Sequence, residues 1–216
     1  MNADDEIESI GGDENNSDEE EEDVAFNVYE QRFIDDLALV RRNDPDTVVL
    51  TADGDSAFVQ SITNEEWEEI GRAISNNTHL ISLSLSSDTL NDDKMSILFG
   101  ELTTSTSIVH IYLSDNGLSA AGLRSMELFL HNSNLRVLDL SGNNIGSEGF
   151  NFLLRALHVN NNVVETIDCN RCGIESIEIN NDCIPIKLLT LHLDDNSINA
   201  NGCKVLAKLL EGEESA

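Results

Sequence analysis

The chain has 216 residues and a formal net charge of −29 at pH 7, from 41 acidic and 12 basic residues. Such an acidic chain repels the phosphates of nucleic acids and anionic membranes, so neither is an expected partner. The sequence shows no signal peptide and no apolar run of about eighteen residues, and its four cysteines do not make a disulfide scaffold. We therefore expect a cytoplasmic protein, with a nuclear location as the alternative.

Residues 1–23 contain twelve acids and no Lys or Arg. Ordering them would cost about 1–2 kcal/mol per residue in backbone entropy, with no apolar burial to offset it. We expect a disordered acidic tail, which either solubilises the protein or docks onto a basic partner.

Residues 24–45 are expected to form an N-terminal capping helix. Four apolar side chains recur at helical spacing on one face, namely Tyr29, Phe33, Leu37 and Val40. Pro45 ends the helix, because the residue before a proline avoids helical backbone angles. A repeat protein leaves the core of its first coil open and needs such a cap.

A degenerate first repeat follows. Val48 to Leu50 has the composition of a strand, with Asp53 at its polar turn position and Ile62 at its closing apolar position. About seven extra residues lie between these two positions, so a loop is expected to bulge there. The segment 64–75 is then predicted to be a helix with Asn64 as its N-cap. Trp67 is expected to pack against a neighbouring coil.

From Leu80 onward one pattern recurs five times: apolar, two variable, apolar, one variable, apolar, two variable, Asn or a substitute, one variable, apolar. The repeats begin at Leu80, Ile108, Leu135, Val164 and Leu188, and these starts lie 28, 27, 29 and 24 residues apart. The polar position is held in turn by Asp88, Asn116, Asn143, Cys172 and Asn196. A fixed period of this length predicts stacked coils around one shared core.

Between the strands, steps of four residues place small and apolar side chains on one helical face, as in Gly149, Leu153 and Leu157. Each unit is therefore expected to be a short strand, a turn and a helix. The fourth repeat is the exception. The strand pattern also fits from Ile174 onward, but a repeat that started there would leave too few residues for the preceding coil. We therefore expect a shortened convex side in the fourth repeat, where Pro185 disfavours a helix.

The LxxLxLxxNxL pattern, best matched from Leu135 to Gly149, resembles leucine-rich repeats of the ribonuclease-inhibitor type over about residues 46–211. The resemblance implies an α/β solenoid with a parallel sheet on the concave side and helices on the convex side. Residues 212–216 would follow as a short acidic C-terminus. The family mostly binds other proteins.

Chemistry other than binding finds little support in the sequence. Cys169 and Cys172 invite a metal or redox site with Cys183 or His192 as further ligands, yet both occupy template positions and are interpreted as structural. Cys203 is likewise expected to pack on its helix. We expect no metal, no cofactor and no enzymatic activity, because no phosphate-binding loop or nucleophile motif is present.

The concave sheet surface is the candidate binding site. Strand positions between the inward leucines point outward, and the residues selected on this face and its rim are Ser84, His110, Tyr112, Asp115, Asp139, Asp168, Arg171, His192 and Asp194. We expect a monomeric, non-catalytic module that binds a protein partner. If the acidic side chains of this face determine which partner binds, the partner has a basic surface.

Three resemblances leave alternatives open. Activators of the Ran GTPase share this repeat class and carry an acidic segment, although in a different order. Asn43-Asp44-Pro45 after a helix and before the repeats is similar to the C-terminal half of the actin-capping tropomodulins. Acidic leucine-rich nuclear proteins pair such repeats with an acidic tail, which keeps histone binding open.

Overall fold

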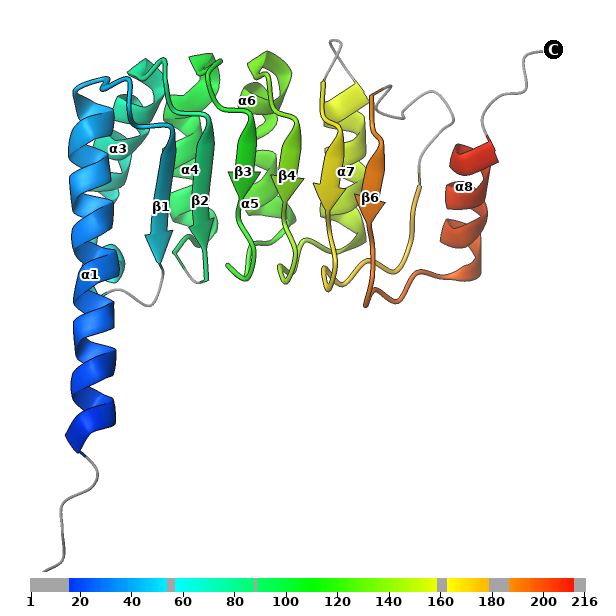
Figure 1. Ribbon diagram of the computed structural model, residues 1–216. Helices are drawn as coiled ribbons and strands as arrows, with labels where there is room; N and C mark the ends of the chain where they lie inside the picture. The colour runs from blue at the N-terminus through cyan, green and yellow to red at the C-terminus, as the bar shows by residue number, and fades with distance from the viewer. Residues whose placement is uncertain (1–15, 54–56, 88, 159–162, 179–186, 212–216) are drawn as a thin grey trace, which may run out of the picture.

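One parallel sheet organises the molecule. The computed structural model describes residues 16–53, 57–87, 89–158, 163–178 and 187–211. Within them six strands pair in sequence order and all in parallel, with helices covering one face of the sheet (Figure 1). The strands are β1 (Val49–Asp53), β2 (Ser82–Ser86), β3 (His110–Tyr112), β4 (Val137–Asp139), β5 (Thr166–Asp168) and β6 (Thr190–His192).

The helices follow the repeats. They are α1 (Asn16–Arg41), α2 (Ala57–Ser61), α3 (Asn64–Asn76), α4 (Asp92–Glu101), α5 (Ala120–Arg124), α6 (Glu127–Asn132), α7 (Gly146–His158) and α8 (Ala200–Glu211). A 3-10 turn, Leu102–Thr104, continues α4. The structure is the predicted α/β solenoid, with one strand per repeat and, within the described residues, one or two helices after every strand except β5.

The sheet register confirms the leucine template. Leu83, Ile111, Leu138 and Ile167 stand opposite one another on β2 to β5, and all are fully buried. The flanking residues on each strand are only half-buried, because they point to the opposite face. The buried side chains form one continuous core between the sheet and the helices, and this core fixes the position of every outward residue.

The N-terminal helix begins earlier than expected. Residues 16–23, predicted to be disordered, form the first turns of α1; acids near a helix N-terminus are favoured by the helix dipole. Residues 1–15 lie outside the described residues. Phe33, Leu37 and Val40 are buried, whereas Tyr29 is 59% exposed. Tyr29, predicted to share one apolar face with these three residues, is not buried with them, because it lines a cavity between α1 and the first two strands.

The first repeat has a different register from the predicted one. Leu50 stands opposite Leu83 and Asp53 opposite Ser86, so Asp53 lies two residues before the polar turn position assigned to it. The predicted insertion contains α2, and Ile62 is buried as expected.

The next helix, α3, is capped by Thr63 rather than by Asn64. The Thr63 hydroxyl accepts from the Glu66 backbone N–H at 3.3 Å, and the Glu66 carboxylate accepts from the Thr63 N–H at 2.8 Å. This reciprocal pair is a capping box, which satisfies two N–H groups instead of one. Trp67 is fully buried, as expected for a packing role.

Asparagine side chains tie each repeat to the one before it. Asn143 Oδ1 accepts from the backbone N–H groups of Asn116 and Leu118 at 3.1 and 3.0 Å. Its Nδ2 donates to the carbonyls of Leu113 and Leu140, both at 2.8 Å. Asn116 and Asn196 bond in the same way one repeat earlier and two repeats later. These buried amides satisfy backbone groups where the chain leaves the strands.

Cysteine replaces asparagine at one position in this series of buried side chains. The Cys172 thiol donates to the Leu140 carbonyl at 3.1 Å. Asp88, the other substitute, lies outside the described residues. The predicted structural role of Cys172 therefore has a direct geometric basis.

Each repeat turns sharply two residues after its last inward strand residue. Ser87, Asp115, Arg171 and Asp195 have φ values between 53° and 60° there, and Gly142 holds the same place with a φ of 70°. Such left-handed backbone is unfavourable for residues with a Cβ. A Cβ at Gly142 would collide with the Asp115 carboxylate, so at this turn the lack of space adds to the backbone angle in favouring glycine.

The C-terminal end is less tightly packed. As predicted, residues 172–178 contain no helix; residues 179–186, including Pro185, lie outside the described residues. Leu191 and Leu193 are only half-buried, whereas their counterparts Leu138 and Leu140 are fully buried. Cys203 is exposed, which corrects the prediction that it packs, because α8 covers the end of the core only partly.

Candidate functional site

The candidate site is the sheet face turned away from the helices, here called the concave face. Its central column runs across six neighbouring strands and consists of Thr51, Ser84, Tyr112, Asp139, Asp168 and His192. All of these side chains except Thr51 were selected from the sequence. Thr51 was missed because the register of the first repeat was misassigned; aligning Leu50 with Leu83 would have added it.

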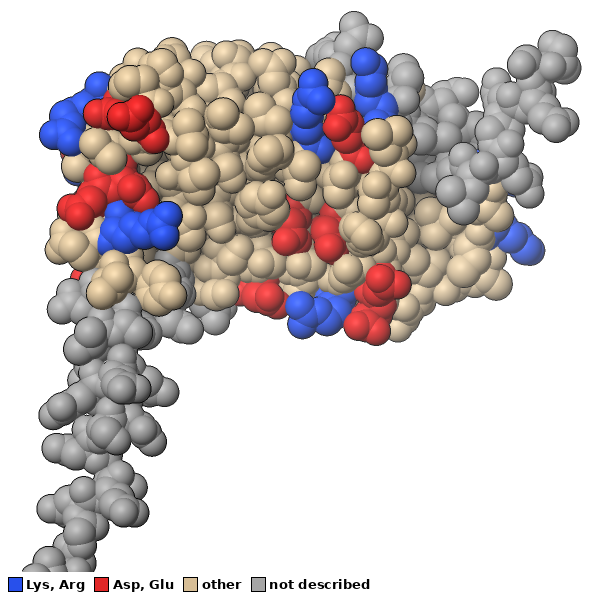
Figure 2. Space-filling view, viewed as in Figure 1, with Lys and Arg blue, Asp and Glu red and all other residues tan. Residues whose placement is uncertain are grey.

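Two carboxylates lie side by side at the middle of this face. Asp139 and Asp168 are partners in the β4–β5 register, which places their backbones about 4.8 Å apart. Asp139 Oδ1 accepts from the Ser141 N–H at 2.9 Å and from its hydroxyl at 2.7 Å. Asp168 Oδ1 accepts from the Asn170 N–H at 2.9 Å. These bonds fix both carboxylates in place, and acidic side chains are visible together near the centre of the face (Figure 2).

Aromatic and imidazole groups lie beside this pair. Tyr112 stands opposite Asp139 in the β3–β4 register, and His110 lies two residues earlier on the same face of β3. Both side chains are half-buried. A tyrosine in such a position supplies apolar contact area together with a hydroxyl, which is typical of a residue that anchors a protein partner.

The rim at the carboxyl ends of the strands carries charges of both signs. Arg171 forms an ion pair with Asp115 at 3.5 Å, although the two residues lie two repeats apart and Gly142 lies between them. Asp194 and His192, at the far end, are exposed. The structure thus brings Asp115 and Arg171 together, while Asp194 belongs to the less tightly packed C-terminal side of the same face.

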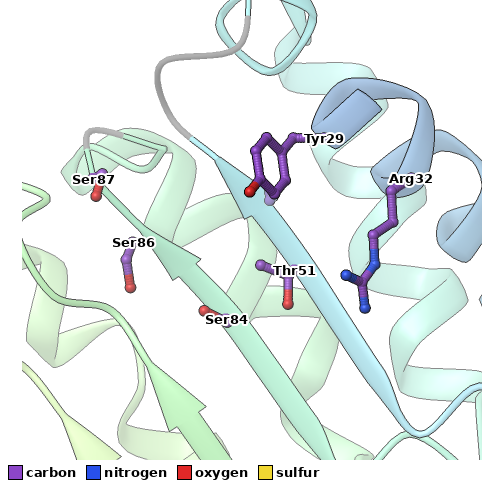
Figure 3. A pocket seen from close by; sticks show the side chains of 7 residues that line it. Tyr29, Arg32, Thr51, Ser84, Ser86 and Ser87 are labelled. Carbon is purple, nitrogen blue, oxygen red and sulfur yellow. The ribbon is translucent and has the colours of Figure 1, made fainter. Parts of the chain in front are cut away.

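A cavity of about 270 Å³ opens at the other end of the concave face, between α1 and the first two strands. It is lined by Tyr29, Arg32, Thr51, Ala52, Ser84, Ser86 and Ser87. Tyr29 and Arg32 reach from α1 toward the serine and threonine side chains on the strands (Figure 3). Sequence reasoning missed this α1–β2 pocket, except for Ser84, because it grouped Tyr29 with the buried face of the capping helix and did not place α1 beside β1.

The cysteine pair belongs to the core and not to this surface. Cys169 and Cys172 are both free and fully buried. The hydrogen bond with Cys172, together with burial, holds the pKa of the Cys169 thiol well above its ordinary value. Cys183 lies outside the described residues. Among those that the structure does describe, no group of three or more His, Cys, Asp or Glu side chains is arranged to hold a metal ion.

No helix in the described part of the chain is long and apolar enough to cross a membrane.

Comparison with known proteins points to one repeat family. The model described as "Leucine Rich repeat" matches residues 131–149 and 186–207. Human "NACHT, LRR and PYD domains-containing protein 5" is 25% identical over 155 residues, which are 69% of this chain and 13% of that protein. Mouse "NACHT, LRR and PYD domains-containing protein 4E" is 26% identical over 161 residues, 71% of this chain and 16% of that protein. The chain therefore matches a small part of these relatives.

Solved structures give the same architecture. "Leiomodin-1 Actin-Binding Site 2 (ABS2)" superposes with a TM-score of 0.55 at 18% identity, covering 83% of this chain and 87% of that one. The tropomodulin C-terminal domain of Caenorhabditis elegans superposes with a TM-score of 0.52 at 14% identity, covering 83% and 91%. At these identities the match concerns the fold alone. The recurring motif, the parallel sheet with one strand per repeat and these matches together identify the chain as a leucine-rich-repeat protein.

Proposed function

We propose that this chain is a non-catalytic module that binds a protein partner through its concave face. The carrying observation is the pair of carboxylates, Asp139 and Asp168, held by hydrogen bonds at the middle of a rigid sheet. Since their positions are fixed before binding, a partner's basic side chain meets two acceptors without paying to order them. Tyr112 beside them supplies the apolar contact that a salt bridge lacks.

Charge supports a basic partner surface. The chain carries a net charge of −29, so long-range attraction would speed the encounter with a cationic protein. The interaction should weaken as salt is added, because exposed charges are screened over about 8 Å at physiological ionic strength. With α1 as its cap, the module is proposed to act as a monomer.

The test compares two matched double variants in a pull-down from native cell extract. Tyr112→Ala with Asp139→Arg alters the concave face. Leu128→Ala with Glu69→Arg makes the same kinds of change on the convex helices α6 and α3, where both residues are exposed. Partner recovery should fall strongly for the concave variant and stay unchanged for the convex one. Equal recovery with both variants would refute the concave site.

Actin binding is the second candidate. One specific observation favours it: the fold matches over 83% of this chain are to an actin-binding site of leiomodin-1 and to a tropomodulin domain. A pointed-end elongation assay with pyrene-labelled actin tests it directly. Slower elongation at micromolar protein would support this function, and an unchanged rate would remove it.

A further inference from the structure

The α1–β2 pocket is rich in hydrogen-bond donors that the fold does not use. Within the described residues, the hydroxyls of Thr51, Ser84, Ser86 and Ser87 make no hydrogen bond to another group. Ser87 also holds a left-handed backbone angle, φ 60°, at the edge of the cavity. The other repeats have the same backbone angle at the equivalent turn position, so the turn places Ser87 at the cavity and does not by itself indicate a site. Hydroxyls that line one cavity and have no partner in the fold can donate to an acceptor-rich group that enters it.

Arg32 adds a positive charge to these donors. Its Nε lies 3.6 Å from the Asp36 carboxylate one helical turn away, and its side chain is 70% exposed. The ion pair is made through Nε, and the two terminal nitrogens of the guanidinium make no hydrogen bond among the described residues. A guanidinium presents such nitrogens in the geometry that suits a carboxylate or a phosphate. Tyr29, at the mouth of the cavity, can cover the bound group.

We propose that the α1–β2 pocket receives an anionic side chain of the protein partner, a carboxylate or a phosphorylated hydroxyl. The inference rests on the proposed function and deepens it, because Ser84 belongs both to the pocket and to the central column of the concave face. The two ends of the binding surface then have opposite preferences: the pocket takes an anion, and the Asp139–Asp168 pair takes a cation.

The sheet sets the spacing between the two sites. From the middle of β1 and β2 to the middle of β4 and β5 there are three strand intervals, or about 14 Å at about 4.8 Å per interval. An extended peptide advances about 3.3 Å per residue. A segment lying across the strands would therefore carry its acidic and its basic side chains about four residues apart.

The experiment uses the full 15N-labelled chain and three nine-residue peptides. Each has one lysine and, four residues before it, glutamate, phosphoserine or glutamine. Binding is followed by the amide chemical shifts of Ser84, Ser86 and Ser87. The glutamate or the phosphoserine peptide should bind about tenfold more tightly than the glutamine peptide, as expected for a charge-assisted hydrogen bond. The tighter of the two identifies the anion.

A matched pair of variants locates the effect. Arg32→Gln should abolish the preference for the anionic peptides. Arg72→Gln should leave it intact, because Arg72 forms an equivalent one-turn ion pair with Glu68 but lies on α3. Equal affinity for all three peptides would overturn the proposal. So would a preference that survives Arg32→Gln, or peptide-induced shifts confined to residues outside the pocket.

Failure of the pocket is distinguishable from failure of the proposed function. Asp168→Lys should weaken all three peptides alike, because each carries the lysine. If that loss occurs while the anion makes no difference, the concave site stands and the pocket proposal falls. If Asp168→Lys has no effect while Arg32→Gln removes the anion preference, the pocket stands and the acidic centre falls.

Discussion

Replacing Asn143 with leucine tests whether the buried asparagine side chains hold neighbouring repeats together. Leucine has nearly the same volume but offers neither donor nor acceptor. The N–H groups of Asn116 and Leu118 would then lose the acceptor that they share. The carbonyls of Leu113 and Leu140 would each keep another donor, Asn116 Nδ2 at 2.9 Å in the first case and the Cys172 thiol at 3.1 Å in the second.

The two orphaned N–H groups dominate the expected effect. Each buried donor without a partner costs about 1–3 kcal/mol, so Asn143→Leu should lower the free energy of unfolding by about 2–6 kcal/mol. A single domain typically has about 5–15 kcal/mol in total, so the change would remove a large share. Urea unfolding followed by far-UV circular dichroism measures it, with linear extrapolation to water.

Two further variants serve as controls. Asn144→Leu changes the exposed neighbour, whose backbone N–H bond to the Leu118 carbonyl stays in place, and should alter stability by less than about 0.5 kcal/mol. Asn143→Cys introduces the residue that the chain itself uses at Cys172 and should fall between the two. A loss below about 1 kcal/mol for Asn143→Leu would refute the view that these amides hold the repeats together.

Three other changes test separate features. Gly142→Val should destabilise the chain by at least about 1–2 kcal/mol in urea unfolding, because its backbone is left-handed and the Asp115 carboxylate occupies the space; an unchanged midpoint would contradict this. Arg124 lowers the pKa of the Glu148 carboxyl. The ion pair therefore stabilises the fold above the ordinary pKa of glutamate, and this contribution is lost as the pH falls through the lowered pKa. The unfolding free energies of wild type and Glu148→Gln should converge in acid, and a difference that stays constant with pH would exclude the effect. Iodoacetamide followed by peptide mapping should label exposed Cys203 in the native state and Cys169 only after unfolding, whereas early labelling of the buried thiol would show that the core opens.

The repeats were predictable because burial follows a period. Leu135, Leu138 and Leu140 recur at fixed offsets, and all three are buried. Once the inward positions are known, alternation along a strand places Tyr112, Asp139 and Asp168 on the opposite face. For this part of the site, the sequence pattern and the fold contain the same information.

Other features depended on contacts that no local pattern reveals. The α1–β2 pocket brings Arg32 and Ser84 together, which requires knowing that α1 lies beside β1 at the edge of the sheet. The register of β1 was hidden because Ala52 stands where all but one of the later repeats have leucine. The Thr63 cap, by contrast, was readable: threonine followed three residues later by Glu66 is the capping-box signature.

The loosely packed last strand gives the concave face a gradient of rigidity. Side chains that are sealed at β4 are half-open to solvent at Leu191 and Leu193, and Leu189 beside them is 81% exposed. Local opening requires the least free energy where the least apolar surface is buried. A protein that binds over β6 would therefore reduce local motion there and lose conformational entropy. One that binds only over β1–β4 would meet a surface that is already rigid.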